Sequence, residues 1–296
     1  MLLLGQIFLY SALQLRPGRL AFIPYFIGPT LLLAAAVVCL ALALIDPVRK
    51  RSLKVLKNQV WWVSLGMLVA VILISLTAYR VFPTSHDGKP SKLCFQLPLR
   101  GDVEVVQGGL TLDVNYHAAF PAQRYAYDLA LIQEGKTHRG EGYVVWNYHI
   151  YGQPVLAPAD GLVIYTSDGD ADQSPSEEGW LPYKSVAGNH MAIEVGPAEY
   201  VFLGHLQPGT IKVRAGERVQ TGQELARAGN SGRSGAPHLH IHLQDSPEFN
   251  GGEGIPMQFC NYLAYDLLDD SHSSKLISQG IPTGRQRKQV VRQIDP

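Results

Sequence analysis

The sequence has no excess of charge of either sign. It contains 25 Lys and Arg residues and 25 Asp and Glu residues, so its formal net charge at pH 7 is zero. A balanced chain of this kind has no overall attraction to nucleic acid or to other acidic polymers. Nucleic acid is therefore not an expected partner.

Charged residues are missing from two long apolar segments, residues 20–45 and 59–79. An α-helix of about 20 apolar residues is long enough to cross a bilayer. In the second segment Trp61 and Trp62 lie at one end and Tyr79 at the other, as in an interfacial aromatic belt. We predict a membrane anchor over residues 1–82 with two transmembrane helices that contact the lipid bilayer. Residues 1–15 are apolar but short, and could form a third span or an interfacial helix.

The loop between the two predicted spans is rich in positive charge. Its only acidic residue is Asp46, whereas its basic residues are Arg49, Lys50, Arg51, Lys54 and Lys57. The positive-inside rule places such a loop in the cytoplasm. We therefore predict a multi-pass protein of the cytoplasmic membrane, whose residues after Tyr79 lie on the extracytoplasmic side, in a periplasm or outside the cell.

Cysteine is scarce, with three residues in the whole chain. Cys39 lies in the first predicted span, while Cys94 and Cys260 lie in the exported part. Exported compartments permit disulfides. A Cys94–Cys260 bridge is one expectation, and two free or buried thiols are the alternative.

Long helical periodicity is absent after the predicted spans. Residues 83–94 are polar and contain Pro, which favours a linker. Short alternating runs separated by Gly, Pro, Asp and Asn follow, and these predict an all-β domain over residues 95–272, a mostly antiparallel sheet or sandwich. Residues 168–183 are acidic and turn-rich, and favour a surface loop near a site. Residues 273–296 contain several basic side chains and few core-forming residues, and they favour a solvated or loosely attached tail.

Histidine is concentrated in the exported part, which holds all ten residues of this type. Three of them alternate in one strand-like run, at His238, His240 and His242, so they share one face while Leu239 and its neighbours face the core. Aligned imidazoles would repel one another if protonated, and they make sense chiefly around a metal. Same-face positions are roughly 6.6 Å apart, so one histidine would bind the metal and another would assist.

Several motifs follow one another in an order shared by few folds. They are Gly-Asn at 188–189, His-Leu at 205–206, Gly-x-x-Val-x-x-Gly-Gln at 216–223 and Pro-His-Leu-His at 237–240. Upstream lie HAAFPAQRYAYDLALI from residue 117 and YGQPVLAPADGLV from residue 151. Together, over residues 117–244 and more weakly to 262, they resemble the lysostaphin/LytM (M23) family of zinc metallopeptidases. The resemblance implies a lysostaphin-type all-β catalytic domain.

Carried onto this sequence, the resemblance implies one Zn²⁺ per chain. Its ligands would be His117, Asp128 and His240, and His205 and His238 would be the catalytic histidines. Two departures from the family pattern stand out. Ten residues separate His117 from Asp128, where the more common motif spaces its His and Asp three residues apart. The residue after the His-Leu-His-Ile run is His242 instead of the usual Glu, and it could tune the site or be exposed.

The resemblance implies metal-assisted hydrolysis of peptide bonds in peptidoglycan stem peptides or cross-bridges. An inactive relative that binds cell wall or activates another hydrolase is an alternative, although all five site residues are present. A phosphocarrier or lipoyl-like carrier shares the hairpin motif. Such carriers belong in the cytoplasm, and the lysine that a lipoyl carrier needs at the hairpin tip is missing.

Overall fold

The computed structural model describes residues 84–175, 181–268, 273–284 and 289–294, together with four isolated positions before residue 70. The predicted spans at 20–45 and 59–79, and residues 1–15, lie outside the described residues apart from those isolated positions. Within the described part of the chain, no helix has the length and apolar character needed to cross a membrane. The chain divides into two compact units, Met1–Ser85 and His86–Pro296, and the second unit is described below.

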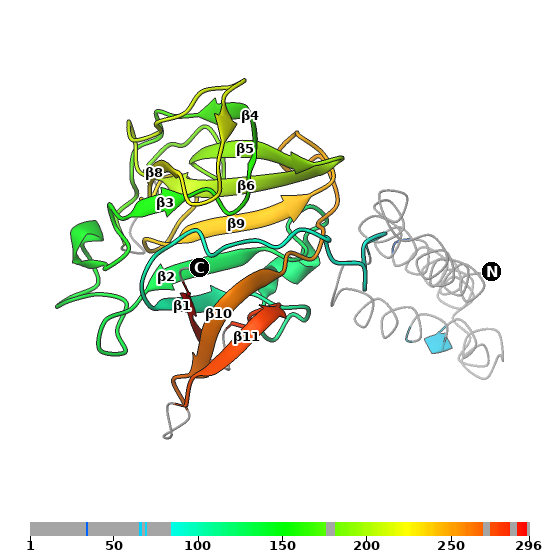
Figure 1. Cartoon of the computed structure of the whole chain (residues 1–296), viewed down its shortest axis with the longest axis horizontal. Helices are drawn as coiled ribbons and strands as arrows, with labels where there is room; N and C mark the ends of the chain where they lie inside the picture. Colours follow the sequence, from blue (N-terminus) through cyan, green and yellow to red (C-terminus); the bar gives the residue numbers. More distant parts are fainter. Residues whose placement is uncertain are drawn as a thin grey trace, which may run out of the picture. The chain divides into compact units, whose positions relative to one another are not determined.

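The second unit is built on a ten-stranded sheet, and each adjacent pair of its strands is antiparallel (Figure 1). In spatial order the strands are β11 (Lys275–Gly280), β10 (Phe259–Asp266), β12 (Gln289–Gln293), β1 (Val103–Gln107), β2 (Tyr127–Leu131), β9 (Leu239–Gln244), β6 (Glu199–Leu206), β5 (Asn189–Gly196), β4 (Gly161–Ser167) and β7 (Arg218–Val219). A second, two-stranded sheet pairs β3 (Pro154–Leu156) with β8 (Glu224–Arg227). The expected mostly antiparallel β-fold is confirmed.

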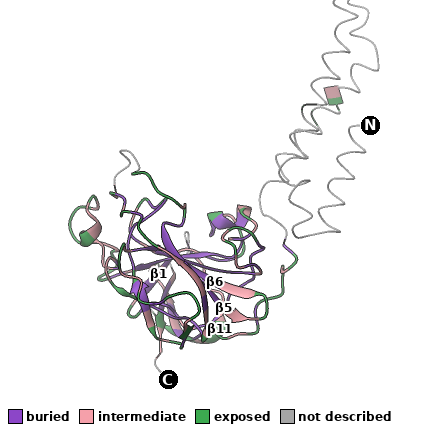
Figure 2. Cartoon of the chain, turned by 90° about the horizontal axis from the view of Figure 1, so that it is seen from above, coloured by how far each residue is buried: buried purple, intermediate pink, exposed green. Residues whose placement is uncertain are grey.

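The alternating residues of β9 contribute to the core as their pattern predicts. Leu239, Ile241 and Leu243 are fully buried and belong to one cluster with residues of β5 and β6, including Ile193 and Leu203. Full burial of each such side chain stabilises the fold by roughly 1.5–3 kcal/mol. In Figure 2 the buried residues follow the strands, and many exposed residues lie in the loops. This apolar side holds β9 in register, so that its histidines face the opposite side.

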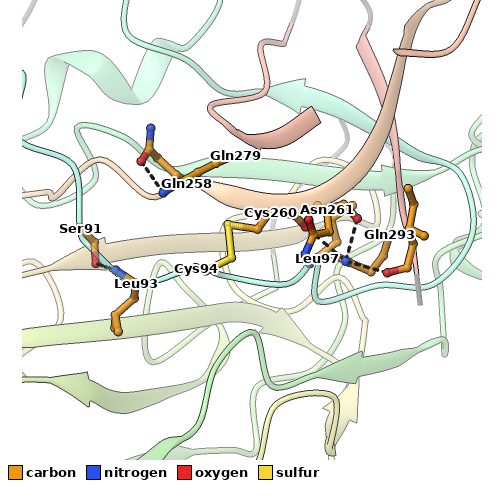
Figure 3. Close-up of a disulfide and its surroundings, with 10 residues drawn as sticks. Ser91, Leu93, Cys94, Leu97, Gln258, Cys260, Asn261, Gln279 and Gln293 are labelled. Atoms are coloured by element: carbon orange, nitrogen blue, oxygen red, sulfur yellow. Dashed lines mark hydrogen bonds between the residues drawn. A yellow bond between two sulfur atoms is a disulfide. The ribbon is translucent and has the colours of Figure 1, made fainter. Parts of the chain in front are cut away.

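A disulfide joins the start of the unit to β10 (Figure 3). It links Cys94 to Cys260 across 166 positions of sequence, with a Cα–Cα distance of 5.6 Å. The neighbouring Phe95 forms a β-bridge with Phe259, and both side chains are fully buried. The predicted bridge is confirmed, and the alternative of two free thiols is wrong.

The C-terminal residues differ from the predicted solvated tail. Residues of β11 pair with β10, and β12 lies between β10 and β1, where Val290 and Val291 are fully buried. The Arg292 guanidinium forms an ion pair with Asp102, with an Nη2–Oδ2 distance of 2.5 Å. Two valines among polar residues are too short a pattern to predict a strand. The prediction of a loosely attached tail was wrong for residues 275–280 and 289–293, and the predicted boundary at 272 falls inside the folded unit.

Candidate active site

Three neighbouring strands bring distant residues to one place in the sheet. Strand β9 lies between β2 and β6 (Figure 1). In the register of β2 and β9, Asp128 is opposite His240, and in the register of β6 and β9, Gly204 is opposite His240. His205 therefore follows directly after the position that faces His240. Sequence separations of 112 and 36 positions are closed in this way by strand pairing. The sheet, and not local sequence, assembles the site.

His117 reaches the site from a short 3-10 helix, η4 (Tyr116–Ala119). Asn115 is the N-cap of this helix, and its side-chain oxygen accepts a hydrogen bond from the backbone N–H of His117 at 3.1 Å. The same oxygen lies 3.0 Å from His117 Nδ1. Asn115 thereby fixes both the helix start and the orientation of the imidazole.

The three residues implied as zinc ligands form one buried cluster. A nitrogen or oxygen of each of His117, Asp128 and His240 lies within 4.8 Å of those of the other two. Asp128 Oδ1 is 3.7 Å from His117 Nε2 and 3.0 Å from His240 Nδ1. Two imidazoles and a carboxylate are a donor set that catalytic zinc accepts, with a further position left for water or substrate. The arrangement fits a metal ion held by these three side chains.

The two histidines implied as catalytic lie beside this cluster. The ring centroids of His205 and His238 are 4.6 Å apart, and His238 Nε2 is 3.5 Å from Asp128 Oδ1. His205 has a positive φ of 59°, a backbone conformation that costs a non-glycine residue about 1–3 kcal/mol. The structure thus brings together all five predicted site residues.

Hydrogen bonds define which nitrogen each of three imidazoles turns toward the site. The Nδ1 atoms of His117, His205 and His238 lie 2.8–3.0 Å from the oxygens of Asn115, Ser231 and Ala236, respectively. A carbonyl oxygen only accepts hydrogen bonds, so Nδ1 carries the proton and donates it in each pair. The Nε2 atom of each ring therefore keeps its lone pair for a metal, a proton or a substrate.

Burial and mutual contact shift the pKa values of these groups. Burial lowers the pKa of His117 to about 4, and it holds the pKa of His205 well below the usual value. Burial alone would raise the pKa of Asp128, but His117, His238 and His240 outweigh it and keep that pKa well below its usual value. For His238 the desolvation is outweighed by Asp128, which raises the pKa. An ionised Asp128 beside neutral His117 is the protonation state that binds a metal cation.

The pKa of His117 predicts a pH-dependent stability of the metal-free chain. Burial depresses the folded-state pKa of His117. Neutral His117 therefore makes its full contribution to stability above pH 6.5, and this contribution is lost as the pH falls through about 4. Between pH of about 7 and about 4.5 the wild type should lose about 2 kcal/mol more unfolding free energy than His117→Phe. Chemical denaturation at both pH values measures this difference. Parallel losses in the two proteins would contradict the assignment.

A groove of about 1150 Å³ runs past the cluster and is lined by Tyr116, Asp128 and His238. Much of its wall comes from residues 133–149, including His138 and His149. Tyr143 and Trp146 of the same segment are 66% and 70% exposed. The acidic segment 168–183 was expected near the site, but none of its described residues lines this groove. Tyr148 of this segment lines the groove, but in sequence it looks like an ordinary strand residue, so no local signal identified the groove wall.

Tyr116 is a further residue that the sequence patterns did not single out. Its hydroxyl donates to Asp128 Oδ2 at 3.4 Å, and its ring lies 4.0 Å from that of His117. Because Tyr116 also lines the groove, it links the metal cluster to the surface that a substrate would contact. A tyrosine beside a histidine has no distinctive spacing, so only the fold reveals this contact.

Comparison with known proteins gives a family for part of the chain. Residues 144–252 match the family described as "Peptidase family M23". This segment includes His205, His238 and His240, while His117 and Asp128 precede it. The glycyl-glycine endopeptidase ALE-1 of Staphylococcus capitis is 29% identical over 136 residues, which cover 46% of this chain and 33% of that protein. The peptidoglycan DD-endopeptidase ShyA of Vibrio cholerae is 34% identical over 92 residues, which cover 31% of this chain and 17% of that protein.

The matched part is thus a third or less of the length of these two relatives. Among solved structures, a zinc-containing peptidase from Vibrio cholerae is 26% identical, with a TM-score of 0.26, and the match covers 46% of this chain and 40% of that chain. The sequence matches support one conclusion: residues 144–252 of this chain match the M23 peptidase family.

Proposed function

We propose that this chain is a zinc-dependent endopeptidase that hydrolyses peptide bonds in peptidoglycan stem peptides or cross-bridges. The observation that carries the proposal is the buried cluster of His117, Asp128 and His240, with His205 and His238 beside it. Zinc held there would polarise the scissile carbonyl and activate water at neutral pH. The relatives named above, which are a glycyl-glycine and a DD-endopeptidase, favour peptidoglycan as the substrate class.

The two histidines beside the cluster have the geometry of proton-transfer groups. In both His205 and His238 the Nδ1–H is bound to a backbone carbonyl, so Nε2 is the atom left to accept or return a proton. The low pKa of His205 suits a neutral base, whereas Asp128 favours the protonated form of His238. In our proposal His205 accepts a proton from the attacking water and His238 stabilises the negative charge that develops on the carbonyl oxygen.

A catalytically inactive cell-wall-binding domain is the other candidate. It is disfavoured because all five site residues are present and converge in the structure. Burying the Asp128 carboxylate is costly, and a domain that only bound cell wall would gain nothing from placing it among three imidazoles.

The catalytic proposal predicts a separation of metal binding from hydrolysis. In the full chain, purified in detergent, His205→Ala should keep about one zinc per chain and lose hydrolysis by about 10²–10⁴-fold, the usual contribution of a general acid–base group. Metal content and peptide release from purified peptidoglycan are the two measurements. A wild type that binds zinc but releases no peptide would favour the non-catalytic candidate.

We also propose that residues after Tyr79 face the extracytoplasmic side, where peptidoglycan lies. This follows from the basic loop between the predicted spans and not from the described residues. A reporter that is active only in the cytoplasm, fused after Pro296, should give no signal. A strong signal would reverse the orientation and remove access to the proposed substrate.

A further inference from the structure

His240 differs from the other histidines of the site in the nitrogen through which it is held. His117, His205 and His238 are each fixed through Nδ1, and they keep Nε2 for the site. His240 has its Nδ1 toward Asp128, and its Nε2 lies 2.9 Å from His242 Nδ1. Its partner is thus another imidazole, which can either donate or accept at that atom. The proton on His240 therefore depends on what decides the tautomer of His242.

Gln244 sets the tautomer of His242, because the orientation of the Gln244 side-chain amide is itself fixed. Its Nε2 donates to the backbone oxygens of Ser246 and Glu248, both at 2.7 Å. An amide nitrogen donates and the amide oxygen accepts, so two carbonyl partners leave Oε1 on the opposite side. That oxygen lies 3.1 Å from His242 Nε2. His242 Nε2 must therefore carry a hydrogen and donate it to Gln244.

The tautomer of His242 in turn sets the position of the hydrogen on His240. A neutral His242 with its hydrogen on Nε2 has a lone pair on Nδ1, which accepts a hydrogen bond from His240 Nε2. Neutral His240 then carries its hydrogen on Nε2 and has a lone pair on Nδ1. This nitrogen is the one that lies 3.0 Å from Asp128 Oδ1, within the proposed metal cluster.

Asp128 favours the opposite arrangement when no metal is bound. An ionised carboxylate only accepts, so Asp128 Oδ1 would attract a hydrogen onto His240 Nδ1. A hydrogen there would block coordination through this atom. The His242–Gln244 pair opposes this pull, because Gln244 disfavours the His242 tautomer that would donate to His240.

The pair is enclosed, so solvent has little access to either side chain. His242 and Gln244 are both fully buried. The His242 ring stacks on Phe202, with centroids 4.9 Å apart and planes at 3°, and Phe249 lies 6.0 Å away. A buried ring between aromatics keeps one orientation, which is what a fixed sequence of donors and acceptors requires.

We propose that His242 and Gln244 are positioning residues that set the tautomer of His240, so that its Nδ1 is presented to zinc. This inference rests on the proposed zinc site. The more common Glu at the position of His242 would accept from His240 without help, whereas His242 accepts only while Gln244 holds its proton on Nε2. The dependence on Gln244 is therefore a property of this chain.

A double-mutant comparison on the full chain in detergent tests the proposal, with zinc affinity measured by competition with a chelator. Gln244→Met should weaken zinc binding by about 10–100-fold, the usual effect of losing such an outer partner. His242→Asn puts an amide oxygen at the place of Nδ1 and needs no donor from Gln244. In the His242→Asn background, Gln244→Met should change zinc affinity less than about threefold. His242→Glu serves as a second background if His242→Asn does not fold.

Equal losses from Gln244→Met in both backgrounds would show that Gln244 acts only through packing, and would overturn the proposal. So would an unchanged affinity in the otherwise wild-type chain. Nitrogen-15 NMR of histidine in the zinc-loaded wild type is an independent readout, with the hydrogen of His240 expected on Nε2 and the metal on Nδ1. The reverse assignment would also overturn the proposal. A wild type that binds no zinc would instead refute the proposed function, and with it the proposed role of His242 and Gln244.

Discussion

Asp128→Asn is expected to abolish zinc binding and peptidoglycan hydrolysis while leaving the fold intact. The substitution keeps the side-chain shape, but it removes the charge that lies within 4 Å of nitrogen atoms of His117, His238 and His240. A neutral amide is a poor zinc ligand, and loss of an outer partner alone costs 10–100-fold in affinity. We therefore expect zinc affinity to fall by more than about 100-fold, measured by chelator competition, and peptide release to fall to background.

Asp160→Asn is the matched control for this experiment. Asp160 is an exposed carboxylate that accepts hydrogen bonds from the backbone N–H and hydroxyl of Thr221, outside the cluster. The Asp160→Asn substitution should leave zinc content and hydrolysis unchanged. If Asp128→Asn retained one zinc per chain at wild-type affinity, Asp128 would not be a ligand and the proposed metal centre would be wrong.

Removal of the last strand is expected to unfold the second unit. A chain ending after residue 284 lacks β12, which pairs with both β1 and β10. It loses the fully buried Val290 and Val291, worth together roughly 3–6 kcal/mol, as well as the hydrogen bonds of two strand pairs. Domains are stable by only about 5–15 kcal/mol, so little or no folded protein should remain. Thermal unfolding followed by circular dichroism, together with the yield of soluble protein, measures this outcome.

Arg292→Ala is the control for this truncation, because it removes the charge of Arg292 and keeps strand β12. Arg292 is partly exposed, and its ion pair with Asp102 is of a kind worth about 0–1 kcal/mol. This variant should therefore unfold within a few degrees of the wild type. A truncated chain that remained as stable as Arg292→Ala would show that the C-terminal residues are a dispensable tail after all.

The strand carrying the histidines was predictable because its period is visible in the sequence. Leucine and isoleucine alternate with His238, His240 and His242, and this pattern requires one apolar and one polar face wherever the strand lies. The structure confirms that the apolar face is core and that His240 and His242 are in contact. By contrast, β12 has only two apolar residues, and its partners lie about 30 and 190 positions away. No local pattern could reveal that pairing.

The groove was difficult to predict because its wall is a loop without a period. Residues 133–149 contain one short 3-10 helix, η5 (Val145–Asn147), and their position beside Asp128 depends on the path of the chain between β2 and β3. Exposed aromatics such as Trp146 look like ordinary strand residues in sequence. A loop is placed by the elements it connects, so its function appears only when those elements are assembled.

The sequence by itself determined the β-character of the second unit, the faces of its histidine-bearing strand and, through resemblance to a family, the five residues of the candidate site. These are local matters, set by side-chain alternation and by motifs of a few residues. Tertiary structure alone decided that Asp128 is opposite His240, that the C-terminal strand completes the sheet, and that Gln244 controls a proton on His240 through His242. Each of these depends on strand register or on hydrogen-bond direction between groups brought together by folding, and neither is encoded in the spacing of residues along the chain.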